Sequence, residues 1–383
     1  MENNVRFYSK NQSADYGVYN PNTFNALDAA IVFIVFLGVE FGVGKVFASL
    51  CAPYINDPEF DFYSYLLVAA VISQLIVFSV AFIASRIRRV DYLSGGGFIF
   101  RLDMVNAFFG VMLAVSLILL FSDLHYSFVD SAQRLFYGRS LQEYEQLLKD
   151  RMRGDAGYYL LYTFVVVPVF PAFFEEAFCR GVIMRGTSQF GKGFAIIVSA
   201  IFFTLMHGNL NQVVLQFVFG LAVGAVVMLT QNFAVGCFMH LFYNVFVVVT
   251  EAVQTSLTSL SDGAGYVGKM VMTIIGLVLF VVSLVYFAKL FIAKIKQKAI
   301  GKTPRYTVAD LNTYALIADN DSNGGYSKII WQSVGIGEFG YQGKTCNYKG
   351  KHFILNSKSN GVISIVFLTI AALISLVLIF VPA

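Results

Sequence analysis

Long apolar stretches fill most of the chain and are separated by short polar segments. A helix needs about 20 apolar residues to cross the hydrocarbon core of a bilayer, which is about 30 Å thick. The stretches do not alternate with period two, and backbone polar groups in lipid must be paired within their own segment, so the pattern predicts helices rather than strands. We predict nine spans, with an error of one either way and a short fifth span: 27–50, 63–85, 103–122, 157–179, 194–208, 211–230, 233–250, 266–293 and 361–382.

One polar stretch, residues 128–152, has the pattern of an amphipathic helix. Leu141, Tyr144, Leu148 and Met152 recur at spacings of three and four, with charged residues between them. This spacing places the apolar side chains on one face of a helix. The helix is predicted to lie on the membrane surface; the pattern leaves open, as an alternative, that it packs on the end of the helix bundle.

The region after the eighth span has a different character. Residues 296–360 are polar and rich in Gly and Tyr, and 328–333 and 352–355 have the pattern of short strands. We predict a small cytoplasmic β-rich insert there, and the sequence assigns it no role. The predicted organisation is a polar N-terminal segment, an eight-span core, this insert and a last span, at 1–26, 27–295, 296–360 and 361–383.

The composition agrees with a membrane protein. Hydrophobic residues make up 57% of the chain and charged residues 13%, and the mean hydropathy is +0.68. A soluble domain carries about 25% charged residues, and a soluble core of this size could not bury so much apolar side chain. These values exclude a secreted disulfide scaffold, a disordered chain, a coiled coil and a nucleic-acid-binding domain. The predicted fold class is an all-α polytopic membrane protein.

Basic residues gather in alternate loops, and this bias sets the predicted orientation. Arginines or lysines follow the second, fourth and eighth predicted spans, whereas the loop between the first two spans is acidic. The N-terminus is therefore predicted to be cytoplasmic and the C-terminal end to lie outside. The net charge of +4 gives no reason to expect a nucleic-acid partner. The predicted location is a bacterial plasma membrane, in which the chain passes through the lipid bilayer several times.

Ionisable side chains are costly at membrane depth, so each one is a functional candidate. Most predicted spans have few polar or ionisable residues, and the exceptions cluster within residues 170–245. Glu176 and Arg180 are four residues apart, so they share a helix face and can pair. Glu175 points about 100° away from its neighbour and is left for other partners. The alternative is a structural ion pair where the helix leaves the membrane.

Two further clusters follow along the chain. His207 ends an otherwise apolar run, and on its own it would be read as a structural residue. His240 and Asn244 are four residues apart, so they point to the same side of a helix. The alternative is that this pair holds helices together by hydrogen bonds.

Helix lengths predict that the clusters meet. Glu175 lies 16 residues before Gly191 and His207 lies 16 residues after it. On two antiparallel helices both are about 24 Å from the turn. His240 is only about 8 residues above the next turn, so the heights agree if the first hairpin projects about 12 Å further. The chain after His207 must then run sideways or the next helix must tilt, and the sequence does not decide between the two.

Two carboxylates, two histidines, an amide and an arginine suffice for hydrolysis of a peptide bond by water. Glu175 would take a proton from a water held between it and His207. His240 and Asn244 would donate hydrogen bonds to the developing oxyanion. The arginine would hold the second carboxylate in place.

A zinc route is open as well. Glu175, His207 and His240 could bind Zn²⁺ as a three-ligand site with an open position for water. The chain has neither an HExxH motif nor a GxSxG motif, so the patterns of soluble zinc proteases and of serine hydrolases are absent.

Three short motifs follow one another in these apolar segments. They are EExxxR, FxxxH and HxxxN, formed by Glu175, Glu176 and Arg180, by Phe203 and His207, and by His240 and Asn244. Together they resemble the motifs of the CPBP intramembrane proteases, also called Abi, a family that includes type II CAAX prenyl endopeptidases and bacteriocin-processing enzymes. The resemblance covers roughly residues 100–250. It implies an eight-helix core and proteolysis within or beside the membrane.

The resemblance also implies roles, residue by residue. Glu175 and His207 would activate water, and His240 and Asn244 would line the oxyanion site. The supporting residues would be Glu176 and Arg180. The family is classed as metalloproteases, although a metal-free glutamate mechanism is also argued for it, so the resemblance leaves the need for zinc open. The expected partner is a membrane-anchored peptide or protein substrate, prenylated or not, and the insert and last span, which lie outside the family core, could dock a substrate or partner.

Two other classes of function compete with a protease. A proton-coupled transporter or channel would use the Glu and His residues as a relay, and it predicts polar residues along several spans and an inverted repeat, neither of which the sequence has. A non-catalytic binder of hydrophobic peptides or lipids would keep the motif residues as a polar core. The sequence alone does not exclude that reading.

Overall fold

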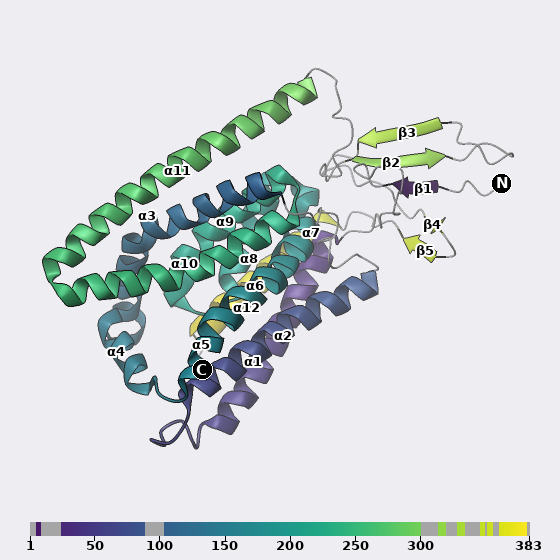
Figure 1. Cartoon of the computed structure of the whole chain (residues 1–383). Helices are drawn as coiled ribbons and strands as arrows, with labels where there is room; N and C mark the ends of the chain where they lie inside the picture. The colour runs from purple at the N-terminus through teal and green to yellow at the C-terminus, as the bar shows by residue number, and fades with distance from the viewer. Residues whose placement is uncertain are drawn as a thin grey trace.

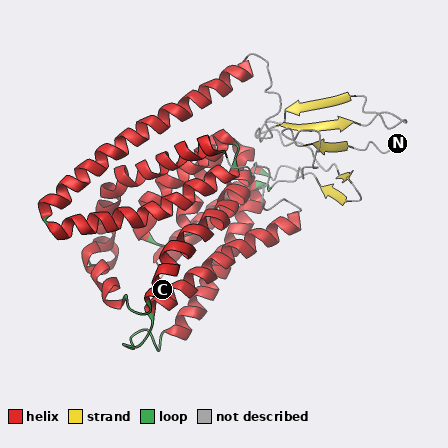
Figure 2. Ribbon diagram, in the orientation of Figure 1, coloured by secondary structure: helices red, strands yellow, loops and turns green. Residues whose placement is uncertain are grey.

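The protein is a bundle of long helices with short strands beside one end of it (Figures 1 and 2). The structure is a computed structural model that describes residues 5–8, 24–88, 103–299, 313–318, 328–333, 345–348, 351–354 and 360–380. Most of the helices run along one common direction (Figure 1). That arrangement is expected when each helix crosses the same slab of lipid.

Within the described residues, eight helical segments are long and apolar enough to cross a membrane. This confirms the predicted all-α polytopic membrane fold. The segments are α1 (Ala26–Cys51), α2 (Phe62–Arg88), α3 (Met104–Tyr137), a helical rod from Ala156 to Phe190, α9 (Val213–Thr230), α10 (Phe233–Leu260), α11 (Asp262–Ala299) and α12 (Gly361–Phe380). The rod consists of α5 (Ala156–Leu161), a π-helical stretch Tyr162–Val166, α6 (Val167–Glu176), a second π-helical stretch Ala177–Met184, α7 (Arg185–Thr187) and a 3₁₀ turn Ser188–Phe190.

The predicted fifth span is too short to count as a full span. It corresponds to α8 (Lys192–Leu205), which has 14 residues. At 1.5 Å per residue this helix is about 21 Å long, less than the hydrocarbon thickness. The chain leaves helical geometry after Leu205, and Gly208 adopts the left-handed conformation with φ of 57°. A 3₁₀ turn, Leu210–Gln212, then leads into α9.

The prediction of one amphipathic helix over 128–152 was wrong. α3 continues through the first part of that segment to Tyr137 and ends at Gly138, which has φ of 65°. A separate helix, α4 (Leu141–Arg151), follows. Leu141 is buried, whereas Leu148 and Met152 are more than a third exposed, so only the first turn of the apolar stripe packs on the bundle. A left-handed glycine separates the two helices, because glycine adopts that conformation without steric cost.

Short strands occur in the segment that follows α11 and near the N-terminus. β1 (Val5–Tyr8), β2 (Thr313–Ala318) and β3 (Lys328–Ser333) form an antiparallel sheet in the order β1-β2-β3, and β4 (Thr345–Tyr348) pairs with β5 (Lys351–Ile354). β3 coincides with one predicted strand, and β5 lies one residue before the other. The polar N-terminal segment thus contributes a strand to the insert. The other parts of 1–26 and 296–360 lie largely outside the described residues, and the insert's cytoplasmic location stays a prediction.

Small residues let the central helices approach closely. A Cβ placed on Gly220 of α9 would lie 3.1 Å from the Cα of Ala200 on α8. A Cβ placed on Gly236 of α10 would lie 2.6 Å from a methyl group of Val227 and 3.2 Å from Oε2 of Glu176. In membranes, such small residues permit helix packing that depends on van der Waals contact. They bring α9 and α10 against the polar centre of the bundle.

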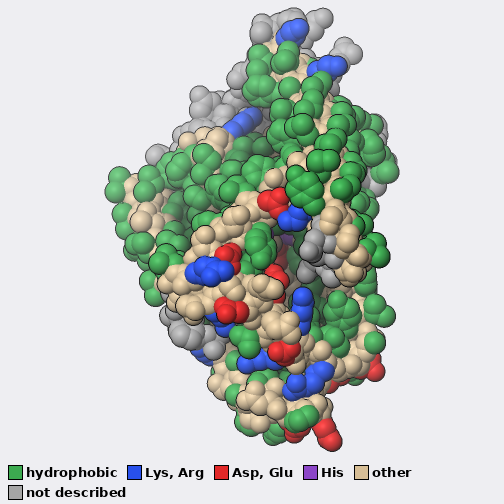
Figure 3. All heavy atoms as spheres, turned by 90° about the vertical axis from the view of Figure 1, so that its left-hand side faces the viewer, with side chains coloured by type: hydrophobic (Ala, Val, Ile, Leu, Met, Phe, Trp, Pro, Cys, Tyr) green, Lys and Arg blue, Asp and Glu red, His purple; other side chains and the backbone are tan. Residues whose placement is uncertain are grey.

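A hydrogen-bonded pair of loops fixes the start of α2 against the start of the rod. The Arg153 carbonyl accepts from the Phe62 amide at 3.0 Å, and the Asp61 carboxylate accepts from the Asp155 amide at 3.1 Å. Gly154 between them has φ of 130°, and a Cβ there would lie 1.9 Å from Asp61 Oδ1, so only glycine fits. Figure 3 shows charged side chains gathered in the lower half of the face where α4 and the α1–α2 loop lie, with hydrophobic side chains above them.

Candidate active site

Prolines alter the helical rod just before the first polar cluster. Pro168 and Pro171 lie within α6, and π-helical stretches occur on both sides of it. Proline has no N–H, so Pro171 cannot donate to the carbonyl of Val167 four residues earlier. The side chain of Asn244 donates to that carbonyl instead, at 3.1 Å. The helical pitch therefore changes on both sides of the prolines, and an amide on α10 satisfies the carbonyl that Pro171 leaves open.

Glu176 has two partners, and both contact the same carboxylate oxygen. Its Oε1 lies 3.0 Å from Nη1 of Arg180, one helical turn on, and accepts from Nδ1 of His240 at 2.9 Å. Arg180 also donates to the Gly220 carbonyl at 3.3 Å and lies over the ring of Phe203. The side chains of Glu176 and Arg180 are fully buried. Removing one charge from such a pair leaves the other buried and uncompensated, so each residue depends on the other for its stability in the bundle.

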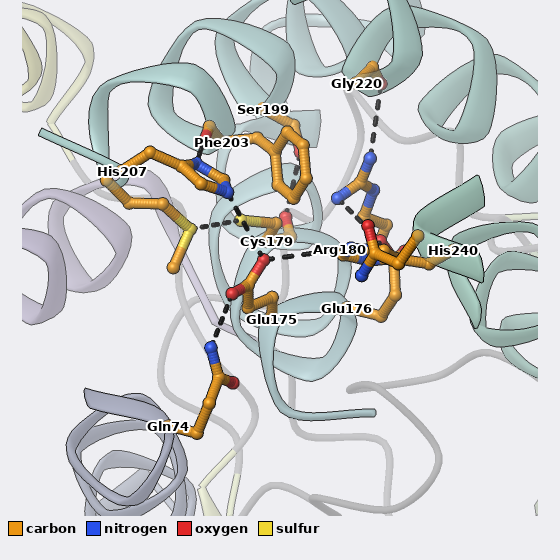
Figure 4. A network of polar contacts seen from close by, with 12 residues as sticks. Gln74, Glu175, Glu176, Cys179, Arg180, Ser199, Phe203, His207, Gly220 and His240 are labelled. Atoms are coloured by element: carbon orange, nitrogen blue, oxygen red, sulfur yellow. Dashed lines mark hydrogen bonds and ion pairs between the residues drawn. The ribbon is translucent and has the colours of Figure 1, made fainter. Parts of the chain in front are cut away.

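Glu175, the adjacent carboxylate, has different surroundings (Figure 4). Its Oε1 accepts a hydrogen bond of 2.7 Å from Nε2 of Gln74 on α2. Its Oε2 is buried and, within the described part of the chain, has no hydrogen-bond partner. Oε2 lies 3.8 Å from Nε2 of His207 and 3.9 Å from Nε2 of His240. One oxygen is thus fixed, and the other faces two imidazole rings without touching them.

The end of α8 positions His207. Nδ1 of this ring lies 2.7 Å from the Phe203 carbonyl one turn earlier. A carbonyl only accepts, so Nδ1 carries the proton and Nε2 presents a lone pair toward Glu175 when the ring is neutral. After the ring, the chain passes through the 3₁₀ turn, where Gln133 of α3 donates to the Asn211 side chain at 2.8 Å.

His240 is positioned from α10. Its Nδ1 bonds to Glu176, so its Nε2 is the nitrogen that faces Glu175. The rings of Phe203 and Phe219 approach the imidazole edge-on, with centroids 5.5 Å and 5.2 Å away. Both Nε2 atoms therefore face Oε2 of Glu175. The two distances are too long for direct hydrogen bonds, and a water between the carboxylate and the imidazoles would bridge them.

The same three side chains are the predicted zinc ligands. Ligands about 2.0–2.1 Å from a tetrahedral zinc ion stand roughly 3.3–3.4 Å apart. The oxygen–nitrogen distances of 3.8 and 3.9 Å are wider. Within the described residues, no group of three or more His, Cys, Asp or Glu side chains is arranged to hold a metal. The arrangement therefore does not fit a zinc sphere as it stands.

The structure brings five of the six predicted site residues into one cluster: Glu175, Glu176, Arg180, His207 and His240. The sixth, Asn244, lies one turn beyond His240 and bonds to the backbone of the rod. The chemical role of each residue stays a prediction.

Two residues near this cluster were missed by sequence reasoning. Gln74 is the hydrogen-bond donor to Glu175. Glu40 on α1 hydrogen-bonds Ser73 and interacts electrostatically with Glu175. The signal was available, because each is a polar side chain within a span that otherwise reads as apolar.

The comparisons with known proteins agree with the motifs. A model of the family described as type II CAAX prenyl endopeptidase Rce1-like matches residues 157–246. This confirms the resemblance over about a quarter of the chain, from the first turn of the rod to the turn after Asn244. No curated protein and no solved structure matches the chain.

Proposed function

We propose that the protein is an intramembrane endopeptidase that uses water to hydrolyse a peptide bond of a membrane-anchored peptide or protein. The match of residues 157–246 to a family of proteases supports proteolysis in general. The observation that supports this mechanism is that Nε2 of His207 and Nε2 of His240 lie 3.8 and 3.9 Å from the buried Oε2 of Glu175. A carboxylate and two imidazoles at these distances suit a reactive water between them.

In the proposed reaction, Glu175 is the general base. Its Oε2 takes a proton from the water while the water oxygen attacks the carbonyl carbon of the scissile bond. His207 accepts a hydrogen bond at Nε2 from the water's other O–H and so orients the attacking lone pair. The protonated Glu175 then gives its proton to the amide nitrogen as the carbon–nitrogen bond breaks. The products are a carboxylic acid, which keeps the water's other hydrogen, and an amine. Transfer of the acid proton to the amine gives a carboxylate and an ammonium group, and Glu175 is ionised again.

His240 stabilises the oxyanion in this scheme. In its protonated form this ring donates from both nitrogens, so Nε2 can donate to the oxyanion while Nδ1 bonds to Glu176. Donors that are already oriented in a dry site are worth more than in water. Glu176 and Arg180 therefore act by holding the imidazole.

Asn244 has a smaller part in this proposal than the motif implies. Its amide donates to the Val167 carbonyl, so its main role is to fix the proline-containing helix that carries both glutamates. A contact between its second amide hydrogen and the oxyanion would be an additional role.

A cleavage assay tests the proposal. The purified parent and the His207→Ala variant are incubated in lipid vesicles with a library of membrane-anchored peptides, prenylated and unprenylated. Mass spectrometry detects the products. We expect the parent to cut some of the peptides and the variant to cut them at least about a hundredfold more slowly, as for loss of a positioned acid–base group.

A chelator arm addresses the metal. Because the donor spacing does not fit zinc, we expect 1,10-phenanthroline to leave the rate within about twofold of the untreated enzyme. A loss of activity that added Zn²⁺ restores would overturn the metal-free route while leaving proteolysis intact. A parent that cuts no peptide in a broad library would overturn the protease and favour a non-catalytic binder.

A further inference from the structure

The site has a polar neighbour outside all three motifs. Gln74 lies on α2, far outside residues 157–246, and donates from Nε2 to Glu175 Oε1 at 2.7 Å. Figure 4 shows its side chain reaching toward Glu175 from a separate helix. Gln74 is 8% exposed and Glu175 is 5% exposed, so the contact is almost dry. A short hydrogen bond to a carboxylate in such surroundings belongs to the strong class.

The orientation of the amide follows from its partner. An ionised carboxylate only accepts hydrogen bonds, so the NH₂ group of Gln74 must face it. Gln74 is uncharged, so it orients Glu175 without neutralising the charge of that carboxylate. Arg180, by contrast, neutralises the charge of Glu176. The difference suits a carboxylate that must keep one oxygen reactive.

The contact leaves the two oxygens of Glu175 unequal. Oε1 is held by Gln74, and rotation about the last side-chain bond is thereby restricted. Oε2 then has one direction available, toward His207 and His240. A free carboxylate in the same place would exchange its oxygens and lose that alignment. Near-attack geometry of this kind contributes to kcat and does not by itself require tighter substrate binding.

The position of α2 is itself fixed. The hydrogen bonds of Asp61 and Arg153 hold the start of α2 to the start of the rod. Along the same two helices, Phe78 packs on Phe174, the residue before Glu175, with ring centroids 5.0 Å apart. Gln74 is therefore presented to the carboxylate by a rigid surface.

We propose that Gln74 is a positioning residue, which pins Glu175 Oε1 so that Oε2 faces the attacking water. This inference rests on the proposed function and extends the site to α2. The competing explanation is that the amide only joins two helices, as polar side chains do in other membrane bundles. The two explanations differ in what they predict for kcat.

The kinetic arm uses three variants in lipid vesicles with the peptide that the parent cuts fastest. Gln74→Met keeps the length and removes the donor; we expect kcat to fall about tenfold to a hundredfold, the range for a lost hydrogen bond to a charged group, with KM changed less than about twofold. Gln74→His restores a ring N–H at a similar reach and should recover most of kcat. The matched control is Ser85→Ala, a buried change on the same helix that removes only a bond to the Phe82 carbonyl, and it should behave as the parent.

The infrared arm needs no substrate. The difference spectrum between the parent and Glu175→Gln identifies the carboxylate stretch of Glu175, and this band depends on the hydrogen bonds that the carboxylate accepts. We expect the band to move in Gln74→Met, to return toward its parent position in Gln74→His and to stay in place in Ser85→Ala.

The outcomes test the proposed function and the role of Gln74 separately. A Gln74→Met enzyme that melts at a lower temperature but keeps the parent's kcat would overturn the positioning role, and so would an unmoved infrared band. If the parent itself cuts none of the peptides, the proposed function fails. The infrared band then decides on Gln74 alone, and its movement in Gln74→Met would support the orienting contact.

Discussion

The two sides of the polar cluster use the same residue types in opposite ways. On one side, Glu176 shares its Oε1 between Arg180 and His240 and is completely buried. On the other side, Glu175 has one oxygen held by an uncharged amide and the other turned toward two imidazoles at distances beyond a hydrogen bond. Each carboxylate also has a buried Oε2 without a hydrogen-bond partner among the described residues, so the two differ in the charge of the partner that holds Oε1. A carboxylate neutralised by Arg180 can support structure, whereas one held by an uncharged amide keeps its charge available for chemistry.

The largest expected effect is on the Glu175 side. Glu175→Gln keeps the shape of the side chain and removes the base, so the rate of peptide cleavage should fall by about 10²–10⁴-fold. Thermal unfolding in detergent should be unchanged or slightly raised, because the variant buries no charge. Glu40→Gln is the matched control: it changes a second carboxylate near the site and should leave most of the rate. A Glu175→Gln enzyme that cuts as fast as the parent would show that Glu175 is not the catalytic base.

On the Glu176 side the expected effect is on stability. Glu176→Gln leaves Arg180 buried without its countercharge and should destabilise the fold by about 3–5 kcal/mol. The melting temperature should drop sharply, with activity lost as a consequence. Replacing both partners, as Glu176→Gln with Arg180→Met, should cost less than the two single changes added together. Additive costs would show that the two residues are not coupled.

A smaller effect is expected where Asn244 meets the proline-containing helix. Asn244→Ala leaves the Val167 carbonyl without a donor and should cost roughly 1–3 kcal/mol of stability. In a Pro171→Ala background, the backbone N–H returns and can satisfy that carbonyl, so Asn244→Ala should then cost much less. The cycle is measured by thermal unfolding of the four proteins. An equal cost in both backgrounds would show that Asn244 stabilises the fold through a partner other than the Val167 carbonyl.

The smallest effect concerns a carboxylate outside the membrane-spanning helices. Glu143 in the first turn of α4 accepts from the backbone N–H of Ser140 at 2.6 Å, and this bond, together with the one from the Ser140 hydroxyl, lowers the pKa of the exposed carboxyl. A carboxyl whose pKa is lower in the folded state stabilises the fold at pH above its unfolded pKa, and this contribution disappears as pH falls through the folded value.

Amide hydrogen exchange across α4 measures this effect. Protection factors should fall at acidic pH in the parent, whereas those of Glu143→Gln should depend little on pH once the intrinsic exchange rate is divided out. A variant with the same acid-dependent loss as the parent would show that the capping box contributes nothing.

Much of this molecule was predictable from local pattern. The apolar stretches predicted the spanning helices, because a span is defined by length and hydropathy along a continuous segment. The spacing of Glu176 and Arg180, and of His240 and Asn244, correctly placed each pair on one helix face. The errors were also local in origin. α8 was predicted as a span although the turn at Gly208 shortens it, and 128–152 was predicted as one helix although Gly138 divides it.

The partners of the candidate site were not predictable in the same way. Gln74 and Glu175 are 101 positions apart, and Asn244 and Val167 are 77 apart. From the sequence, Asn244 was predicted to bind the oxyanion, because the motif places it beside His240. The motif contains no information about the carbonyl that Pro171 leaves without a donor. Gln74 was passed over, since a single amide in an apolar span has no local feature that names its partner.

The sequence by itself determined that the chain spans a membrane, where its helices run and which three stretches carry polar side chains. These depend on interactions among residues close together along the chain, namely hydropathy over one span and contacts one helical turn apart. Only the tertiary structure decided which oxygen of Glu175 is held, which nitrogen of each histidine faces it and which backbone carbonyl Asn244 reaches. Those choices depend on how helices pack against one another, and that packing arises from close contacts between small residues distributed over the whole bundle.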